Sequence, residues 1–337
     1  MMKLYKILFF NSMILGTLIA ISSFSWLGMW MGLEINLLSI IPLMNSSKNM
    51  LTSEASLKYF ITQAMASLVL LLSITLMMIT NESITPMVDI PFMTLLNSAL
   101  LTKLGAAPFH FWFPEVMEGL SWFNCSILLT WQKIAPMALL SNNQLQINFM
   151  VIIIMISLMV STLMSLNQVS LRKIMAFSSI NHIAWMISAM ISSISIWMIY
   201  LMIYIFITLN ITYIFNYSKI SLINQIPSIL NSDKTLKFSL MINFLSLGGL
   251  PPLLGFLPKW FTINWMIIHN YLFLALTLII ATLIMLFVYM RIMTSALLIS
   301  HNETKKINFK MNKLLIFTVN FLAISSLISC TLIFSML

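Results

Sequence analysis

Long apolar runs recur from one end of the sequence to the other, separated by short polar segments. Each run is close to the roughly 20 residues that an α-helix needs to cross a bilayer. Hydrophobic residues make up 60% of the 337-residue chain and charged residues only 7%, too little charge to cover a soluble protein of this size. The pattern predicts an all-α polytopic membrane protein, with residues 1–337 forming a single membrane domain.

Hydropathy divides the chain into about eleven membrane-spanning helices. The predicted spans are residues 4–21, 24–43, 56–80, 90–106, 121–140, 147–165, 173–191, 194–217, 238–260, 268–296 and 313–335.

The basic residues favour an odd number of spans. With this count, the loops on the N-terminal side hold thirteen of the 17 lysines and arginines, the opposite loops hold none, and the remaining four lie inside helices. Basic residues concentrate in cytoplasmic-type loops. The N-terminus is therefore predicted on the cytoplasm-like side and the C-terminus on the opposite side.

Glycine and proline interrupt the fourth and ninth spans. Pro108 removes an amide donor and restricts Ala107, and residues 248–258 combine several glycines and prolines that a continuous helix does not tolerate. Interrupted helices at corresponding positions are typical of inverted-repeat transporters. The sequence predicts two five-helix inverted repeats, about 4–140 and 147–296, each with a broken fourth helix, plus a C-terminal helix at about 313–335. The alternative is that the prolines only kink packed helices.

Four ionisable residues lie deep in apolar spans: Glu34, Lys103, Lys133 and Lys259. A charge at the bilayer centre costs roughly 2.5–3.5 kcal/mol on insertion scales, so such residues usually serve a function. Burial disfavours a charged lysine and a nearby carboxylate stabilises it, so Lys103 beside Glu34 retains its proton until the pair separates. His182 titrates near neutral pH and suits a relay. These five residues are the predicted proton-transfer groups.

Each candidate also has a structural interpretation. Glu34 is alternatively a packing carboxylate, with the lysines at 103 and 133 as its partners. Lys259 is alternatively a snorkelling side chain, and His182 alternatively bonds the hydroxyl of Ser178 or Ser179.

Four further polar residues have open roles. Arg291 fits a snorkelling anchor better than a relay. Glu115 and Glu118 form either a proton entrance or, as we favour, a solvated rim, and His110 lies close enough to the first break to be functional or structural.

Several functions are disfavoured. The basic residues form a collar beside the membrane rather than a nucleic-acid groove. The two cysteines, Cys125 and Cys330, support neither a disulfide framework nor a metal cluster. No G-x-G-x-x-G motif or iron–sulfur cysteine cluster is present. Redox chemistry is therefore expected on other chains, and this chain is expected to carry no cofactor.

Several segments resemble the animal mitochondrial NADH dehydrogenase subunit 2 family, antiporter-like subunits of the membrane arm of respiratory complex I. The resemblance covers most of the chain. It is carried by SWLGMWMGLEIN (25–36), KLGAAPFHFWFPEV (103–116), GGLPPLLGFLPKW (248–260) and the shorter segments 54–60, 129–133, 167–168, 171–176 and 178–180.

The resemblance implies a proton-translocating subunit. Glu34 and Lys103 are then the paired groups of the first half, Lys133 leads towards the second half, His182 is central, and Lys259 belongs to the second broken helix. Asn181 departs from the family, which commonly has a small residue beside the histidine.

The resemblance also implies location and partners. The chain is then a multi-pass protein of the mitochondrial inner membrane, with its N-terminus on the matrix side and its C-terminus on the intermembrane-space side. It is an obligate hetero-oligomer with other membrane-arm subunits of complex I, in contact with lipid such as cardiolipin. NADH, FMN, iron–sulfur clusters and ubiquinone are expected on other subunits. The alternatives are a stand-alone cation/proton antiporter and a passive membrane-arm scaffold.

Overall fold

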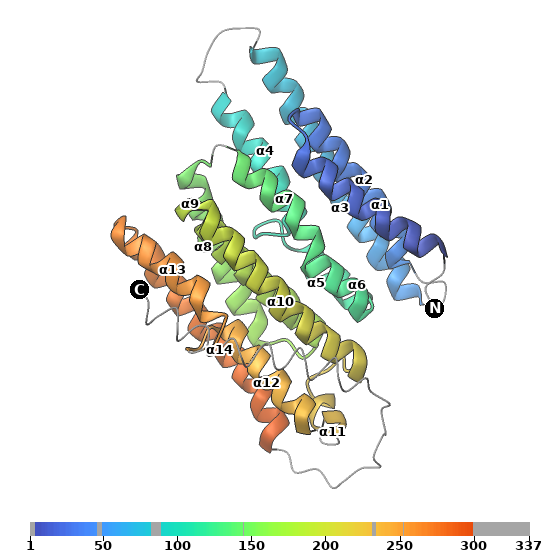
Figure 1. The fold of residues 1–337 in the computed structure, drawn as a ribbon, viewed down its shortest axis with the longest axis vertical. Coiled ribbons are helices and arrows are strands. Elements are labelled where there is room, and N and C mark those ends of the chain that lie inside the picture. Colours follow the sequence, from blue (N-terminus) through green and yellow to red (C-terminus); the bar gives the residue numbers. More distant parts are fainter. Residues whose placement is uncertain are drawn as a thin grey trace. The chain divides into compact units, whose positions relative to one another are not determined.

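The computed structural model describes residues 4–45, 49–81, 89–143, 145–230, 234–251 and 253–298. These residues form α-helices joined by short connections (Figure 1). One isolated antiparallel β-bridge, between Ser170 and Leu222, is present among them. The all-helical prediction is confirmed for this part of the chain. The predicted span 313–335 lies outside the described residues.

The chain divides into two compact units, residues 1–157 and 158–337, with the division inside α8 (Ile147–Leu166). In the first unit α1 packs on α2, α2 on α3, and α3 on both α4 and α5, while α7 contacts α1, α2, α4 and α6. Its helices are α1 (Leu4–Ser22), α2 (Trp26–Met44), α3 (Met50–Asn81), α4 (Asp89–Leu104), α5 (Trp112–Gly119), α6 (Trp122–Leu129) and α7 (Trp131–Asn142).

In the second unit α9 packs on α10 and α13, and α14 packs on α11, α12 and α13. Its helices are α9 (Leu171–Ser192), α10 (Ile194–Ser218), α11 (Gln225–Leu230), α12 (Lys234–Gly248), α13 (Phe256–Ile268) and α14 (Leu272–Leu298).

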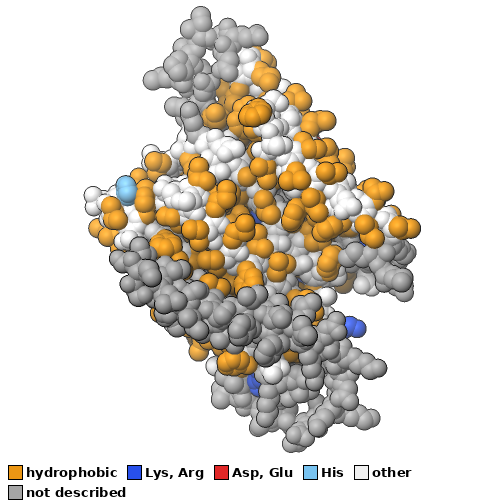
Figure 2. Space-filling model, viewed as in Figure 1, with side chains coloured by type: hydrophobic (Ala, Val, Ile, Leu, Met, Phe, Trp, Pro, Cys, Tyr) orange, Lys and Arg blue, Asp and Glu red, His pale blue; other side chains and the backbone are white. Residues whose placement is uncertain are grey.

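Seven helices in the described part of the chain are long and apolar enough to cross a membrane: α1, α2, α3, α8, α9, α10 and α14. The face drawn in Figure 2 is covered mainly by hydrophobic side chains. A hydrocarbon surrounding is compatible with that surface.

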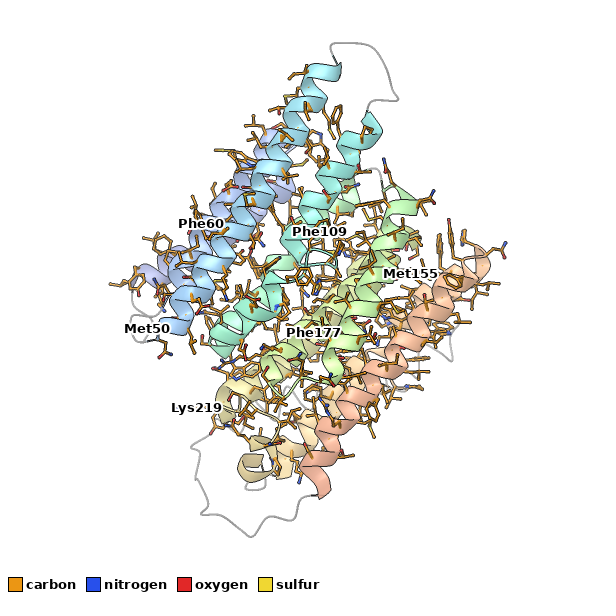
Figure 3. All side chains as sticks on the ribbon, turned by 180° about the vertical axis from the view of Figure 1, so that it is seen from behind. Met50, Phe60, Phe109, Met155, Phe177 and Lys219 are labelled. Carbon is orange, nitrogen blue, oxygen red and sulfur yellow. The ribbon has the colours of Figure 1, made fainter. Side chains whose placement is uncertain are left out.

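Several predicted boundaries are wrong. Helix α3 begins at Met50 rather than residue 56 (Figure 3), because its polar start is itself helical: Lys58 bonds Glu54 one turn earlier at 2.9 Å. Helix α13 continues to Ile268 rather than residue 260, and α14 begins at Leu272 rather than residue 268.

The predicted span 121–140 is two helices, α6 and α7, separated at Thr130. The Thr130 hydroxyl donates to the Ser126 carbonyl at 2.7 Å, and Pro136 has no amide to bond the Gln132 carbonyl. Both features weaken the backbone ladder around the interruption, which sequence analysis did not identify.

A close approach of α1 and α2 fixes the helix that carries Glu34. A Cβ atom added to Gly32 would lie 2.5 Å from the Ala20 amide nitrogen, so only glycine fits there. Gly32 precedes Glu34 by half a turn, and the packing therefore sets the height and rotation of the carboxylate.

Candidate functional site

The first broken helix ends one residue after Lys103. Gly105 adopts a left-handed φ of 76°, its amide donates to the Thr102 carbonyl at 3.1 Å, and the Ala106 amide donates to the Leu101 carbonyl at 3.1 Å. This pair of hydrogen bonds is a Schellman cap, which favours glycine at the left-handed position. The next helix, α5, starts at Trp112. The predicted interruption of this span is confirmed.

Lys103 lies in the last turn of α4 and is 7% exposed. It lines a small pocket, with a volume of about 10 Å³ for water, together with other polar side chains, namely Asn36, Tyr59, Gln63 and Gln132. Its ammonium donates no hydrogen bond to any residue that the structure describes. The buried charge therefore depends on longer-range electrostatics and on whatever occupies the pocket.

Glu34 on α2 supplies the electrostatic partner of Lys103. The two side chains interact as opposite charges, without a direct ion pair between them in the described residues. The Glu34 Oε1 atom is buried and has no hydrogen-bond partner among the described residues. An unpaired buried oxygen is costly, so this pair is not a closed structural salt bridge.

Lys133 on α7 is 3% exposed, and its Nζ lies 5.8 Å from the centre of the Phe113 ring. A cation over an aromatic face is stabilised by the ring quadrupole. Phe113 belongs to α5, so the segment that follows the first break contacts the second buried lysine of this unit.

The second broken helix has the same cap as the first. Helix α12 ends at Gly248, and Gly249 has a left-handed φ of 79°. The Gly249 amide donates to the Ser246 carbonyl at 3.0 Å, and the Leu250 amide donates to the Leu245 carbonyl at 3.3 Å. The predicted interruption of the ninth span is therefore also confirmed.

Lys259 follows the second break, on the first turn of α13, and is held tightly. Its Nζ donates to the Leu247 and Gly248 carbonyls, at 3.0 Å each, and lies 5.6 Å from the centre of the Trp185 ring. The Leu247 and Gly248 carbonyls are at the C-terminal end of α12 and carry partial negative charge. The side chain is 6% exposed, so the snorkelling alternative is wrong.

His182 lies in the middle of α9 and is 4% exposed. Its Nδ1 is 2.8 Å from the hydroxyl of Tyr200, on α10, and its ring centre is 5.1 Å from that of Tyr204. The neighbouring Asn181 has a buried Oδ1 without a hydrogen-bond partner among the described residues. The hydroxyl group that bonds His182 is that of Tyr200, and the bond to Ser178 or Ser179 stays a prediction.

The residues with open roles are also placed. Arg291 donates to the carbonyls of Leu166 and Gln168, at 2.5 Å and 2.8 Å, and so caps the end of α8. Glu115 bonds Lys58 at 2.9 Å in an exposed ion pair, as a solvated rim requires. His110 is buried in the linker between α4 and α5 beside Phe111.

Sequence analysis did not single out the uncharged polar residues around Lys103: Asn36, Tyr59, Gln63 and Gln132. A usable signal was present, because Tyr59 and Gln63 are one helical turn apart on α3 and Gln132 directly precedes Lys133. The five predicted residues fall into both units: Glu34, Lys103 and Lys133 in the first, His182 and Lys259 in the second.

Comparison with known proteins gives consistent results. The sequence model for the transmembrane part of the NADH:quinone oxidoreductase/Mrp antiporter family matches residues 23–285. The Aedes aegypti protein named NADH-ubiquinone oxidoreductase chain 2 is 50% identical over 342 residues, covering 100% of both chains. The Anopheles gambiae protein of the same name is 47% identical over 341 residues, covering 99% of both chains.

The fold has a counterpart in a solved structure. A chain of respiratory complex I from Thermus thermophilus superimposes with a TM-score of 0.88 at 21% identity, covering 97% of this chain and 79% of the bacterial chain. At this identity the likeness concerns the fold.

Proposed function

The chain belongs to the NADH:quinone oxidoreductase/Mrp antiporter family of membrane proteins, and on this basis we propose that it is a proton-translocating, antiporter-like subunit of respiratory complex I. The full-length likeness to two proteins named NADH-ubiquinone oxidoreductase chain 2 supports this assignment. NADH, FMN, iron–sulfur clusters and ubiquinone then belong to other subunits. The chain works as an obligate member of a hetero-oligomer, in the mitochondrial inner membrane and in contact with lipid.

We propose that the described residues contain ten membrane spans. Seven are the continuous helices, and the other three are the interrupted pairs α4–α5, α6–α7 and α12–α13. The predicted helix at 313–335 is the eleventh. Five spans then precede residue 147 and five follow it, as two inverted repeats within one membrane domain require. Matching glycine caps in the fourth span of each repeat support the symmetry.

The orientation follows from the basic residues. Thirteen lysines and arginines fall in the loops and helix ends on one side and none on the other when eleven spans are counted. In the inner membrane the positively charged loops face the matrix. The N-terminus then lies on the matrix side and the C-terminus on the intermembrane-space side.

One observation carries the proposed mechanism. The Lys103 ammonium and the Glu34 carboxylate are electrostatic partners that share no direct bond. In a low-dielectric surrounding, opposite charges stabilise each other strongly over several ångströms. When the carboxylate is near and ionised, Lys103 keeps its proton. When the carboxylate moves away or becomes protonated, the desolvated ammonium releases it.

The remaining buried groups continue the transfer in the proposal. Lys133, His182 and Lys259 can each gain or lose a proton, and each sits beside groups that stabilise one charge state without fixing it permanently. Phe113 faces Lys133, the Tyr200 hydroxyl bonds His182, and α12 carbonyls bond Lys259. A proton change at one site alters the field at the next, which couples the sites.

The test is the number of protons pumped per NADH oxidised by the whole complex in liposomes. Glu34→Ala and Lys103→Ala are expected to lower this ratio. Lys58→Ala is the matched control, because Lys58 is an exposed lysine of the same unit. Normal pumping by assembled Glu34→Ala and Lys103→Ala complexes would mean that the chain is a passive scaffold. Cation/proton exchange by the isolated chain in liposomes would instead favour a stand-alone antiporter.

A further inference from the structure

The pocket beside Lys103 is walled by a continuous hydrogen-bonded row of neutral polar groups. The Tyr59 hydroxyl donates to Gln132 Oε1 at 3.4 Å, and Gln132 Nε2 donates to Asn36 Oδ1 at 2.6 Å. The three residues come from α3, α7 and α2, so a single amide links three helices around the pocket. All three side chains line it together with Lys103.

The row fixes the orientation of the central amide. Gln132 accepts at its oxygen and donates at its nitrogen, and a flip of the amide would place its oxygen against the Asn36 Oδ1 acceptor. A carboxamide is not a general acid or base at neutral pH, and it does not carry the transferred proton. Its effect must therefore come from position and polarity.

Unlike the three residues of this row, the nearby Lys103 ammonium and Glu34 Oε1 have no hydrogen-bond partner among the described residues. The Lys103 ammonium has three donor hydrogens and bonds no described residue, while Glu34 Oε1 is buried without a partner. Amide oxygens retain a second acceptor position. Water held against the oriented amide oxygens would accept a hydrogen bond from the ammonium group.

We propose that Gln132 is a positioning residue for proton uptake and release at Lys103, acting by orienting water in this pocket. The proposal rests on the proposed function and adds a residue to it. Gln132 precedes Lys133 on α7, and Lys133 faces Phe113 rather than the pocket. The amide therefore ties the helix of the second lysine to the pocket of the first.

The experiment uses the intact complex in liposomes and compares three substitutions at one position and its neighbour. Gln132→Met keeps the length of the side chain and removes both hydrogen bonds. Gln132→Glu keeps both bonds while its carboxyl group is protonated, but once ionised it adds a second counter-charge for Lys103. Tyr59→Phe removes one bond. The control is Asn143→Leu, which removes a buried amide–amide bond to Asn97 of 3.1 Å in the same unit, away from the pocket.

We expect the rate of proton pumping per assembled complex to fall about three- to tenfold in Gln132→Met, the range that one or two lost buried hydrogen bonds correspond to. Tyr59→Phe should show a smaller loss. Gln132→Glu should pump better than Gln132→Met at low pH, where its carboxyl group is protonated, and should lose this advantage as the pH rises and the group ionises. Asn143→Leu should pump normally once corrected for the amount of assembled complex.

The outcomes separate two kinds of failure. If Lys103→Ala abolishes pumping while Gln132→Met pumps normally, the positioning role is wrong and the proposed function stands. If Gln132→Met and Gln132→Glu lose pumping equally at every pH, or lose it only in proportion to lost assembly, Gln132 is structural and the proposal also fails. If Lys103→Ala itself pumps normally, the proposed function fails first.

Discussion

The two broken helices have the same backbone cap, but their lysines have different bonding partners. Both end with a left-handed glycine, Gly105 or Gly249, and the same pair of cap hydrogen bonds. Lys103 stands before its break, faces a polar pocket and has a distant carboxylate as counter-charge. Lys259 stands after its break and is bound directly by two carbonyls that the break exposes.

The difference shows that a helix break has two uses near a buried charge. At the second break, the helix supplies the counter-charge itself, because its terminal carbonyls have no partner within the helix. At the first break, the lysine belongs to the helix that ends, so its side chain reaches other groups. The charge on Lys103 then depends on Glu34, whereas the charge on Lys259 needs no carboxylate.

The largest expected effect on stability comes from removing the lysine that caps its break. Lys259→Met leaves the Leu247 and Gly248 carbonyls without their donor inside the membrane, at a cost of about 1–3 kcal/mol for each buried unpaired group. Lys103→Met breaks no side-chain hydrogen bond. Thermal melting of the assembled complex should therefore drop clearly for Lys259→Met and little for Lys103→Met, although both lose pumping. Equal melting temperatures would contradict the distinction.

The next effect separates the two glycines. Gly105→Ala and Gly249→Ala each force a side chain into the left-handed region, costing roughly 1–2 kcal/mol. Only at Gly249 would the new Cβ also lie 2.9 Å from Lys259 Nζ. Gly249→Ala should therefore be the more damaging of the two. Its effect should also be partly absent in a Lys259→Met background, which a double-mutant cycle of melting temperatures measures.

The sequence predicts the breaks well because glycine and proline act locally. The caps at Gly105 and Gly249 depend on a few adjacent residues, so their positions follow from the chain itself. The interruption at Thr130 was missed because a threonine inside a helix is usually tolerated. The early start of α3 was missed because Glu54 looks like a loop residue in a hydropathy profile, although it pairs with Lys58 one turn later on the helix.

The partners of the buried charges could be predicted only in part. The locations of Glu34 and Lys103 follow from their apolar surroundings in sequence. The carbonyl bonds of Lys259 and the Tyr200 partner of His182 join residues from different helices, and a single sequence contains no direct signal for such pairs. The row of Tyr59, Gln132 and Asn36 was missed because it also joins different helices. In addition, burying a neutral polar residue costs less than burying a charge, so such a residue is a weaker signal of function.

A smaller effect is expected at His182, whose partner is the neutral Tyr200 hydroxyl rather than a carboxylate, as for Lys103, or backbone carbonyls, as for Lys259. Tyr200→Phe removes the bond to His182 Nδ1, worth about 1 kcal/mol, and with it one restraint on the orientation of the ring. Pumping should fall moderately while melting changes little. Tyr213→Phe is the control, because Tyr213 lies on the same helix and is 41% exposed. If Tyr200→Phe pumps as well as Tyr213→Phe, the hydroxyl does not orient the histidine for transfer.

The smallest effect should come from the exposed ion pair at the start of α3. Glu115→Gln removes a carboxylate that bonds Lys58, with side chains 57% and 42% exposed. Exposed pairs of this kind contribute little, because water and salt screen them. Pumping and melting should both match the unchanged complex, as a solvated rim implies. A clear loss of pumping at normal assembly would instead make Glu115 a proton entrance. The contrast between Lys103 and Lys259 would then have to include Glu115 as a further functional charged group of the first unit.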